Sequence, residues 1–192
     1  MKRRDFLASA AAPAILSRPA SAAARKRPNF IFIYTDDQRW DAIRAMGRQP
    51  WLRAAVGIVG AFSFDTTSDS MRQFGNSGLF PQLSLIQPMF EDYVPDPGAR
   101  DDPSADLTRA NAEVFPMTFI AAAEYDVFRN ASAVMAARLK EAGRLHSFKI
   151  YPRMAHLFFG FSREVECAAN CVSDVAHFLA ERMPAVSTEV FS

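Results

Sequence analysis

Two apolar runs determine the fold class of this chain: P-M-T-F-I-A-A-A-E-Y-D-V-F-R-N at residues 116–130 and L-H-S-F-K-I-Y-P-R-M-A-H-L-F-F at residues 145–159. The first run is almost continuously apolar over residues 118–123, as in a parallel strand that is buried on both faces. Between the two runs lies a segment long enough to cross over between parallel strands, which takes about a dozen residues. The sequence therefore predicts a strand–helix–strand unit and an α/β fold.

The connecting segment has the signals of a helix. Asn130 and Ser132 are residue types that cap helix N-termini. Apolar residues then recur at helical spacing, and Gly143 follows them as a C-terminal glycine does. The members of this apolar set are Ala131, Val134, Met135, Leu139 and Ala142.

One acid/base side chain follows each predicted strand. Asp126 closes the first run, and His156 follows the second. The carboxyl ends of neighbouring parallel strands lie at one edge of a sheet, where α/β folds build their sites. We therefore expect Asp126 and His156 to lie at one site, where both side chains could take part in acid/base chemistry.

At these residues the chain resembles the α/β-hydrolases of the hormone-sensitive-lipase-like esterase group. The motif E-Y-D-x-x-R appears at residues 124–129, and Y-P-x-M-x-H-x-F appears at residues 151–158. In that family they supply the triad acid and the triad histidine, so the resemblance implies that Asp126 and His156 are catalytic residues. Their order matches the α/β-hydrolase order of serine, acid, histidine. Two residues depart from the family pattern: Asn130 replaces a common acidic residue, and Leu157 replaces a usual glycine.

The resemblance covers about residues 52–184 and implies a partial α/β-hydrolase fold, with parallel strands, flanking helices and an incomplete sheet. The expected strands lie near residues 54–61, 117–123 and 147–152, and residues 29–34 form a further apolar strand pattern. A later helical stripe should cover one face of the sheet; it comprises Val165, Ala168, Ala169, Val172, Ala176 and Leu179. An incomplete sheet leaves an edge that favours self-association.

The function that the resemblance implies is carboxylic-ester hydrolysis of a small ester substrate, without a cofactor. The nucleophile motif G-x-S-x-G does not occur in the sequence; the nearest string is G-N-S-G at residues 75–78. Because the loss of one triad member costs several orders of magnitude in rate, we expect the chain to be inactive alone. Ser77 is the first serine to test as a nucleophile.

An apolar set within residues 62–108 matches the part of the family that helps to form the acyl pocket. Its members are Phe80, Leu85, Met89 and Phe90. They are candidates for the pocket wall, and a purely structural role in the core is an equal alternative.

The first 22 residues have the form of a bacterial twin-arginine export signal. Arg3 and Arg4 precede a short apolar region, and A-S-A at residues 20–22 is typical of a cleavage site. We therefore expect a periplasmic or secreted protein. The remaining chain divides into residues 23–52, residues 53–184 and a tail at residues 185–192.

Residues 27–52 resemble the opening of a type I sulfatase, through R-P-N-F-I-F-I-Y-T-D-D-Q-R-W-D-A. In that family two adjacent aspartates bind calcium, so Asp36 and Asp37 are candidate calcium ligands; carboxylate oxygens suit this cation. The sulfatase nucleophile motif C-x-P-S-R is absent from the sequence. A sulfuric-ester hydrolase fragment and a non-catalytic fusion remnant therefore remain as alternatives.

The composition of the chain bears on nucleic-acid binding, membrane spans and disulfide bonds. The chain has 192 residues with a formal net charge of +1, so no basic excess indicates nucleic-acid binding. No apolar run reaches the length of a membrane span. Cys167 and Cys171 are four residues apart, a spacing that seldom allows a disulfide within a helix, and we expect them to be small buried residues.

Overall fold

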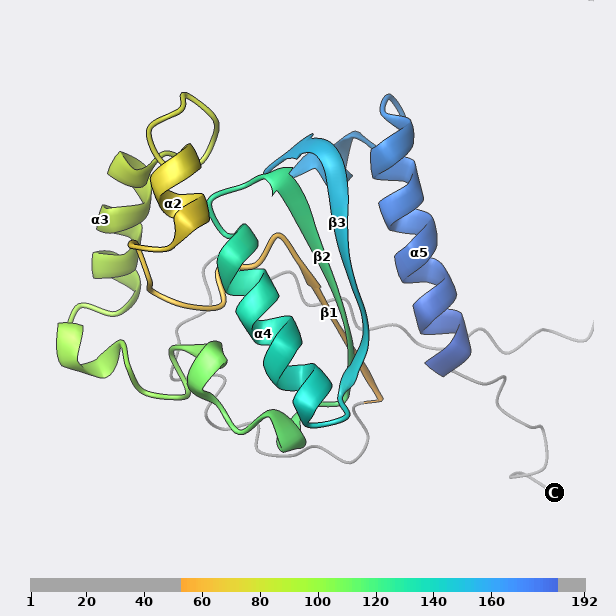
Figure 1. The fold of residues 1–192 in the computed structure, drawn as a ribbon, viewed down its shortest axis with the longest axis horizontal. Coiled ribbons are helices and arrows are strands. Elements are labelled where there is room, and N and C mark those ends of the chain that lie inside the picture. Colours follow the sequence, from red (N-terminus) through yellow and green to blue (C-terminus); the bar gives the residue numbers. More distant parts are fainter. Residues whose placement is uncertain (1–52, 183–192) are drawn as a thin grey trace, which may run out of the picture. The chain divides into compact units, whose positions relative to one another are not determined.

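The computed structural model describes residues 53–182, which contain a three-stranded parallel sheet (Figure 1). Its strands are β1 (Ala54–Ile58), β2 (Met117–Tyr125) and β3 (Leu145–Ala155), in the order β1-β2-β3. β2 pairs with both neighbours in parallel. The predicted α/β class with parallel strands is confirmed. The export signal, the sulfatase-like segment and the strand pattern at residues 29–34 lie outside the described residues.

β2 is the buried centre of the sheet, and its alternate side chains face two different helices. Phe119, Ala121 and Ala123 share an apolar cluster with α5 (Glu166–Arg182). Ile120 belongs to a second cluster with α4 (Arg129–Glu141). The two helices therefore cover opposite faces of the sheet, as Figure 1 shows.

α4 differs from its prediction at the start and agrees with it at the end. The helix begins at Arg129 after an N-cap at Phe128, so neither Asn130 nor Ser132 is the cap. Asp126 Oδ1 instead accepts the backbone N–H of Phe128. At the other end Gly143 has φ +66°, and the N–H of Arg144 donates to the carbonyl of Leu139 at 2.7 Å. This is a Schellman motif, for which glycine is the least strained residue.

The buried line of α5 is rotated from the predicted stripe. Ala168, Cys171 and Phe178 are buried, whereas Val172 is 47% exposed. The buried positions are three and seven residues apart, which places them on one face of the helix, and the ring of Phe178 packs against Phe119 of β2. Cys171 is buried as expected, but Cys167 is only half-buried.

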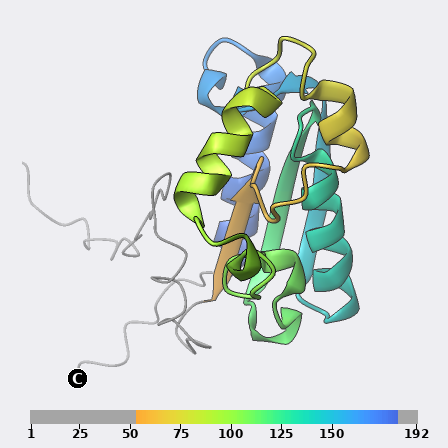
Figure 2. The ribbon, with the colours of Figure 1, turned by 90° about the vertical axis from the view of Figure 1, so that its left-hand side faces the viewer.

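The connection from β1 to β2 carries the short helices α2 (Asp69–Phe74) and α3 (Leu83–Tyr93) (Figure 2). Three single turns follow, at Pro97–Ala99, Leu107–Arg109 and Ala112–Val114. Pro88, an expected helix break, lies inside α3. The carbonyl of Ser84 that loses its N–H partner belongs to an exposed residue, which water can solvate.

The chain leaving β1 folds back on the strand through one aromatic ring. A Cβ atom added to Gly57 would lie 2.5 Å from Phe62, and one added to Gly60 would lie 2.8 Å from the same ring. Phe62 therefore packs against backbone at both glycines.

Within residues 53–182, none of the helices is both long and apolar enough to cross a bilayer.

Candidate active site

The structure brings Asp126 and His156 together. Asp126 directly follows β2 and His156 directly follows β3, so both lie at the carboxyl edge of neighbouring strands. The distance from His156 Nδ1 to Asp126 Oδ2 is 2.9 Å. The two residues are far apart in sequence, and the parallel pairing of β2 with β3 is what places them in contact.

The carboxylate of Asp126 is held from both sides. Its Oδ2 contacts the imidazole, and its Oδ1 accepts the N–H of Phe128 at 2.9 Å. The Asp126 side chain is 1% exposed and the His156 side chain is 12% exposed. A buried carboxylate that accepts Nδ1–H fixes the neutral imidazole in the tautomer whose Nε2 can accept a proton.

Two aromatic rings flank the imidazole. The ring centroid of Phe128 lies 5.6 Å from that of His156, and the centroid of Phe80 lies 5.9 Å from it. Within residues 53–182, Nε2 of His156 has no hydrogen-bond partner. The pair can therefore take a proton from a group that approaches Nε2.

Leu157 adopts the left-handed conformation immediately after the histidine, with φ 61° and ψ 13°. Here the sequence departs from the family glycine. For an L-residue with a Cβ atom this conformation costs roughly 1–2 kcal/mol. The loop keeps the backbone shape that suits glycine although leucine occupies the position.

Two further charged residues brace the site, and sequence reasoning missed both. Glu124 Oε2 accepts the backbone N–H of Arg153 at 2.7 Å, across the irregular end of the β2–β3 pair. Arg129 Nη1 donates to the carbonyl of Glu124 at 2.8 Å. Both residues stand in the motif at residues 124–129, but their partners come from other elements, so spacing alone gives no signal of these contacts.

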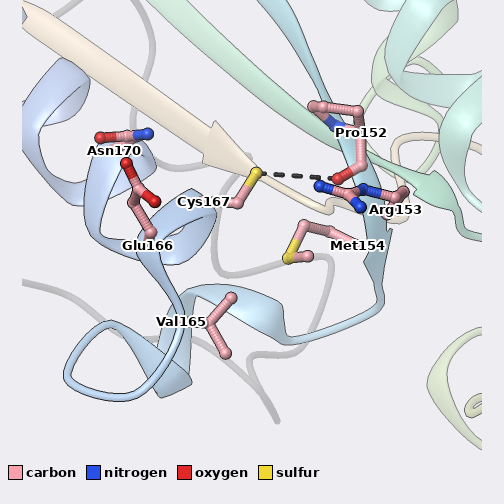
Figure 3. A pocket seen from close by; sticks show the side chains of 7 residues that line it. All are labelled: Pro152, Arg153, Met154, Val165, Glu166, Cys167 and Asn170. Atoms are coloured by element: carbon pink, nitrogen blue, oxygen red, sulfur yellow. Dashed lines mark hydrogen bonds between the residues drawn. The ribbon is translucent and has the colours of Figure 1, made fainter.

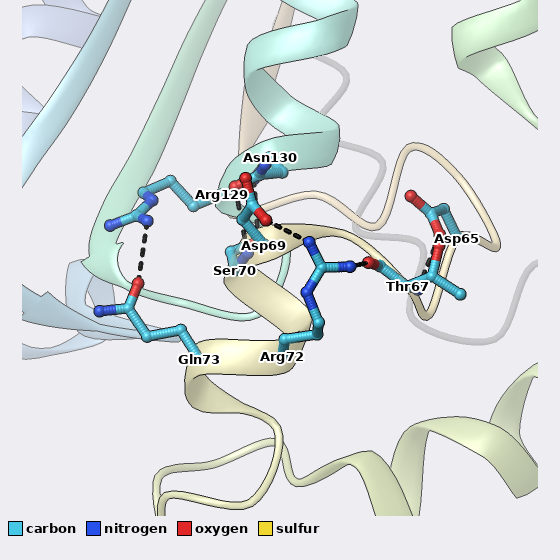
Figure 4. Close-up of polar contacts among 8 residues, drawn as sticks. All are labelled: Asp65, Thr67, Asp69, Ser70, Arg72, Gln73, Arg129 and Asn130. Carbon is cyan, nitrogen blue, oxygen red and sulfur yellow. Dashed lines mark hydrogen bonds and ion pairs between the residues drawn. The ribbon is translucent and has the colours of Figure 1, made fainter.

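Asn130 is bonded to α2 rather than serving as a cap. Its Oδ1 accepts the N–H of Ser70 at 3.3 Å, and its own N–H donates to Ser70 Oγ at 3.1 Å (Figure 4). Ser70 Oγ also donates to the carbonyl of Val127 at 2.7 Å. This buried serine therefore joins α2 to the turn that follows Asp126.

The same close-up shows how α2 and its preceding loop are tied to neighbouring side chains. Arg129 Nη2 donates to Gln73 Oε1 at 3.3 Å, and Arg72 contacts both Asp69 and the carbonyl of Thr67 (Figure 4). The Arg129–Gln73 bond joins α2 to the start of α4, whereas the Arg72 contacts lie within α2 and the loop before it.

Ser77 does not complete a triad in the described contacts. Its Oγ donates to the carbonyl of Phe74 at 2.7 Å, at the end of α2, and forms no hydrogen bond with His156. The residue is exposed.

The four candidate pocket-wall residues divide into two groups. Phe80, Leu85 and Met89 are exposed, and Phe80 also contacts the imidazole. Phe90 instead packs inward, with its ring centroid 4.9 Å from that of Phe64. The exposed group is available to a ligand, whereas Phe90 is a packing residue.

A separate open depression of about 530 Å³ lies between the end of β3 and the start of α5 (Figure 3). Neither Asp126 nor His156 lines it. Cys167 Sγ lies 3.7 Å from the carbonyl oxygen of Pro152 inside it. The lining residues are Pro152, Arg153, Met154, Val165, Glu166, Cys167 and Asn170.

Beside this depression a polar cluster joins β3 to α5. Asp174 accepts the hydroxyl of Tyr151 at 2.7 Å and contacts Lys149 Nζ at 2.7 Å. The Lys149 ammonium lowers the pKa of Asp174, while burial and the bond to Asp174 raise the pKa of Tyr151. Burial also raises the pKa of the Cys171 thiol. These shifts keep the phenol and the thiol neutral, as structural groups should be.

Comparison with known families identifies the domain. Residues 39–160 match a family model described as alpha/beta hydrolase fold. The chain belongs to this family. The matched part of the alpha/beta hydrolase domain includes β1, β2 and β3 with Asp126 and His156.

Solved esterases have the same fold as this hydrolase domain. A thermostable esterase from Pseudomonas putida is 22% identical with a TM-score of 0.66, over 76% of this chain and 46% of its own. Carboxyl esterase 2 from the fungus Tuber melanosporum is 23% identical with a TM-score of 0.65, over 76% and 49%. A hyperthermophilic esterase from the archaeon Pyrobaculum calidifontis is 20% identical with a TM-score of 0.66, over 74% and 46%. The chain spans about half the length of these structures.

The candidate calcium ligands Asp36 and Asp37 lie outside the described residues. Within residues 53–182, no group of three or more histidine, cysteine, aspartate or glutamate side chains is arranged to hold a metal ion.

Proposed function

We propose that Asp126 and His156 form the proton-transfer part of a carboxylic-ester hydrolase site. The observation that carries this proposal is the 2.9 Å contact between His156 Nδ1 and the buried carboxylate of Asp126. This contact leaves Nε2 of the neutral imidazole as the proton acceptor, which is the role of a general base. The esterases among the similar structures support an ester as the substrate class.

The substrate carbonyl would approach beside Phe80. This ring is 57% exposed and contacts the imidazole, and Leu85 and Met89 are exposed nearby in sequence on α3. Apolar side chains beside a base favour an ester with an apolar acyl group, because burial of each CH₂ contributes about 0.8 kcal/mol.

Because the G-x-S-x-G motif is missing, we expect different rates for activated and unactivated esters. An activated ester such as a p-nitrophenyl ester has a leaving group that needs no protonation, so a general base acting on water accelerates its hydrolysis by roughly 10²–10⁴-fold at most. An unactivated alkyl ester also requires a nucleophile and an oxyanion site, and it should not be hydrolysed by this chain alone.

The deciding experiment is hydrolysis of p-nitrophenyl acetate by the purified chain from residue 23 onward. His156→Ala should reduce the rate to that of buffer, and Asp126→Asn should lower it at least about tenfold because the tautomer is no longer fixed. The matched control is His177→Ala, which removes an exposed histidine of α5. Equal rates in the unmodified chain and His156→Ala would reject the proposal and favour a non-catalytic remnant.

Hydrolysis of an unactivated ester would reveal a nucleophile in the chain. Labelling with a fluorophosphonate, followed by mass spectrometry, would locate it, and Ser77→Ala is the first variant to test.

A further inference from the structure

The outer edge of β1 has unpaired backbone groups that face away from β2. Val59 N–H donates to the carbonyl of Ala121 at 2.8 Å, which fixes the direction of that peptide group toward β2. Because successive peptide groups of a strand point to opposite sides, the N–H groups of Val56 and Ile58 point to the other edge. Within residues 53–182, no strand pairs with that edge.

The two outer strands of the sheet differ in their suitability as edges. β3 contains Lys149, Pro152 and Arg153, and Arg153 has φ 59° beside an irregularity in the pairing. Charged residues, proline and irregular pairing are the features by which natural edge strands avoid further pairing. β1 has the sequence A-A-V-G-I and contains none of them.

Both faces of β1 are covered by the described chain. The ring of Phe62 lies against Gly57 on one face. Ala54, Val56 and Ile58 pack against the apolar cluster shared with α5 on the other. A short apolar strand covered on both faces is typical of the interior of a parallel sheet rather than of its edge.

We propose that residues 31–34, I-F-I-Y, from the apolar pattern at residues 29–34, add a strand parallel to β1 at this outer edge. The segment is apolar at nearly every position, which fits a strand with both faces buried. Residues 35–53 connect it to β1 and exceed the dozen or so residues that a parallel crossover needs. An antiparallel hairpin usually takes a loop of only a few residues, so the connection favours the parallel arrangement.

The parallel direction has a consequence for the sheet. Its fourth strand would end at the same edge as β2 and β3, where Asp126 and His156 lie. The carboxyl ends of all four strands would then share one edge, as in other parallel α/β sheets.

Amide hydrogen exchange, followed by NMR on the full chain, tests this pairing residue by residue. Val56 and Ile58 N–H should exchange at least roughly 100-fold more slowly than in an unstructured peptide, because protection requires a hydrogen-bond partner. Gly57 and Val59, whose N–H groups face β2, are internal references.

The variant Ile31→Pro with Phe32→Pro removes two successive N–H groups from the proposed strand, so one of them is lost whichever way the strand faces. Val56 and Ile58 should then lose their protection while Gly57 and Val59 keep theirs. The matched control places the same two prolines at Ala23 and Ala24, in the preceding connector, and should leave all four amides unchanged.

Three results would overturn the proposal. The first is fast exchange of Val56 and Ile58 in the unmodified chain. The second is protection that persists in the Ile31→Pro, Phe32→Pro variant. The third is protection that grows with protein concentration together with a dimer in sedimentation, which would assign the edge to a second copy.

Cysteine pairing covers the case in which the proline variant unfolds. Single cysteines at positions 31, 32 and 33 are each combined with Ala55→Cys, in a chain that also carries Cys167→Ala and Cys171→Ala. An intramolecular disulfide should form in at least one of the three at dilute concentration, because neighbouring strands lie about 4.8 Å apart, within the Cα separation that a disulfide allows. No disulfide in any of them would reject the pairing.

Discussion

The carboxylate of Glu124 accepts the backbone N–H of Arg153 at 2.7 Å. This hydrogen bond joins the last residues of β3 before His156 to the end of β2. Glu124 is half-buried and Arg153 has a positive φ of 59°. The glutamate therefore stabilises a strained backbone position between the two residues of the candidate dyad.

Replacing Glu124 with alanine should lower the free energy of unfolding by about 1–2 kcal/mol, because a hydrogen bond to a charged group is lost. His156-dependent hydrolysis of p-nitrophenyl acetate should fall as well, since the position of the imidazole depends on this end of β3. Urea denaturation and the rate assay check both effects. Glu164→Ala removes an exposed glutamate before α5 and should change neither.

Leu157 provides a test of backbone strain. The stability difference between its glycine and alanine variants should be opposite in sign to the same difference at a control position. Both Leu157→Ala and Leu157→Gly remove the side chain, but only glycine relieves the left-handed conformation at φ 61°. Leu157→Gly should be more stable than Leu157→Ala by about 1 kcal/mol. At Val134, an exposed position inside α4, the glycine variant should instead be less stable than the alanine variant by about 1 kcal/mol. The same order at both sites would contradict the strain.

The Asp174 cluster predicts a pH-dependent contribution to stability. The bond from Lys149 lowers the pKa of Asp174 in the folded state, so its contribution is present above the ordinary carboxyl pKa of about 3.9 and is lost as the pH falls through the lowered value. Asp174→Asn should therefore be less stable than the unmodified chain at pH 7, and the difference should shrink toward about pH 2. Urea denaturation at both pH values measures it. Asp92→Asn, on the exposed side of α3, should show no such trend.

Chelation separates the two hydrolase classes that the sequence suggests. Ester hydrolysis through Asp126 and His156 uses no metal, so EDTA should leave the His156-dependent rate unchanged. A sulfuric-ester hydrolase would depend on a divalent cation at Asp36 and Asp37, and Asp36→Asn with Asp37→Asn should abolish it. Hydrolysis of p-nitrophenyl sulfate that EDTA removes would favour the sulfatase class.

Export is expected to depend on the paired arginines. Fusion of residues 1–22 to a reporter that is active only in the periplasm should give a signal in a bacterial host, and Arg3→Lys with Arg4→Lys should remove it. Arg18→Lys, outside the paired motif, is the control. Reporter activity that persists after the double substitution would show that export does not depend on these arginines.

The sequence predicted the sheet well because its strands are apolar and the helix between β2 and β3 ends at a glycine. Gly143 was found from its residue type alone, since φ +66° suits glycine. The start of α4 was missed, because Ser70, which is distant in sequence, accepts the N–H of Asn130 in the first turn of the helix. Capping rules see only local residues.

The meeting of Asp126 with His156 was predictable from two strand ends and a known family order. The hydrogen bonds that support these two residues were not predictable from the sequence. Glu124 reaches Arg153, and Asn130 reaches Ser70, through contacts between segments that are distant in sequence. The rotation of α5, which buries Cys171 and exposes Val172, depends on how the ring of Phe178 fits against Phe119. Apolar periodicity in the sequence predicts that a helix has a buried face, but it does not fix the rotation of the helix about its axis.

Asp126 and His156 come from one continuous β2–α4–β3 unit, whose connecting helix and turns lie between residues 117 and 156. Their alignment is therefore inherited as one piece. A gene rearrangement upstream of residue 116 would leave this segment continuous, but it would exchange Ser70 and Phe80, which contact the turn after Asp126 and the imidazole. A nucleophile that lies on another strand has to be gained or lost separately. In evolutionary terms, one continuous segment of the gene therefore encodes both members of the Asp126–His156 contact.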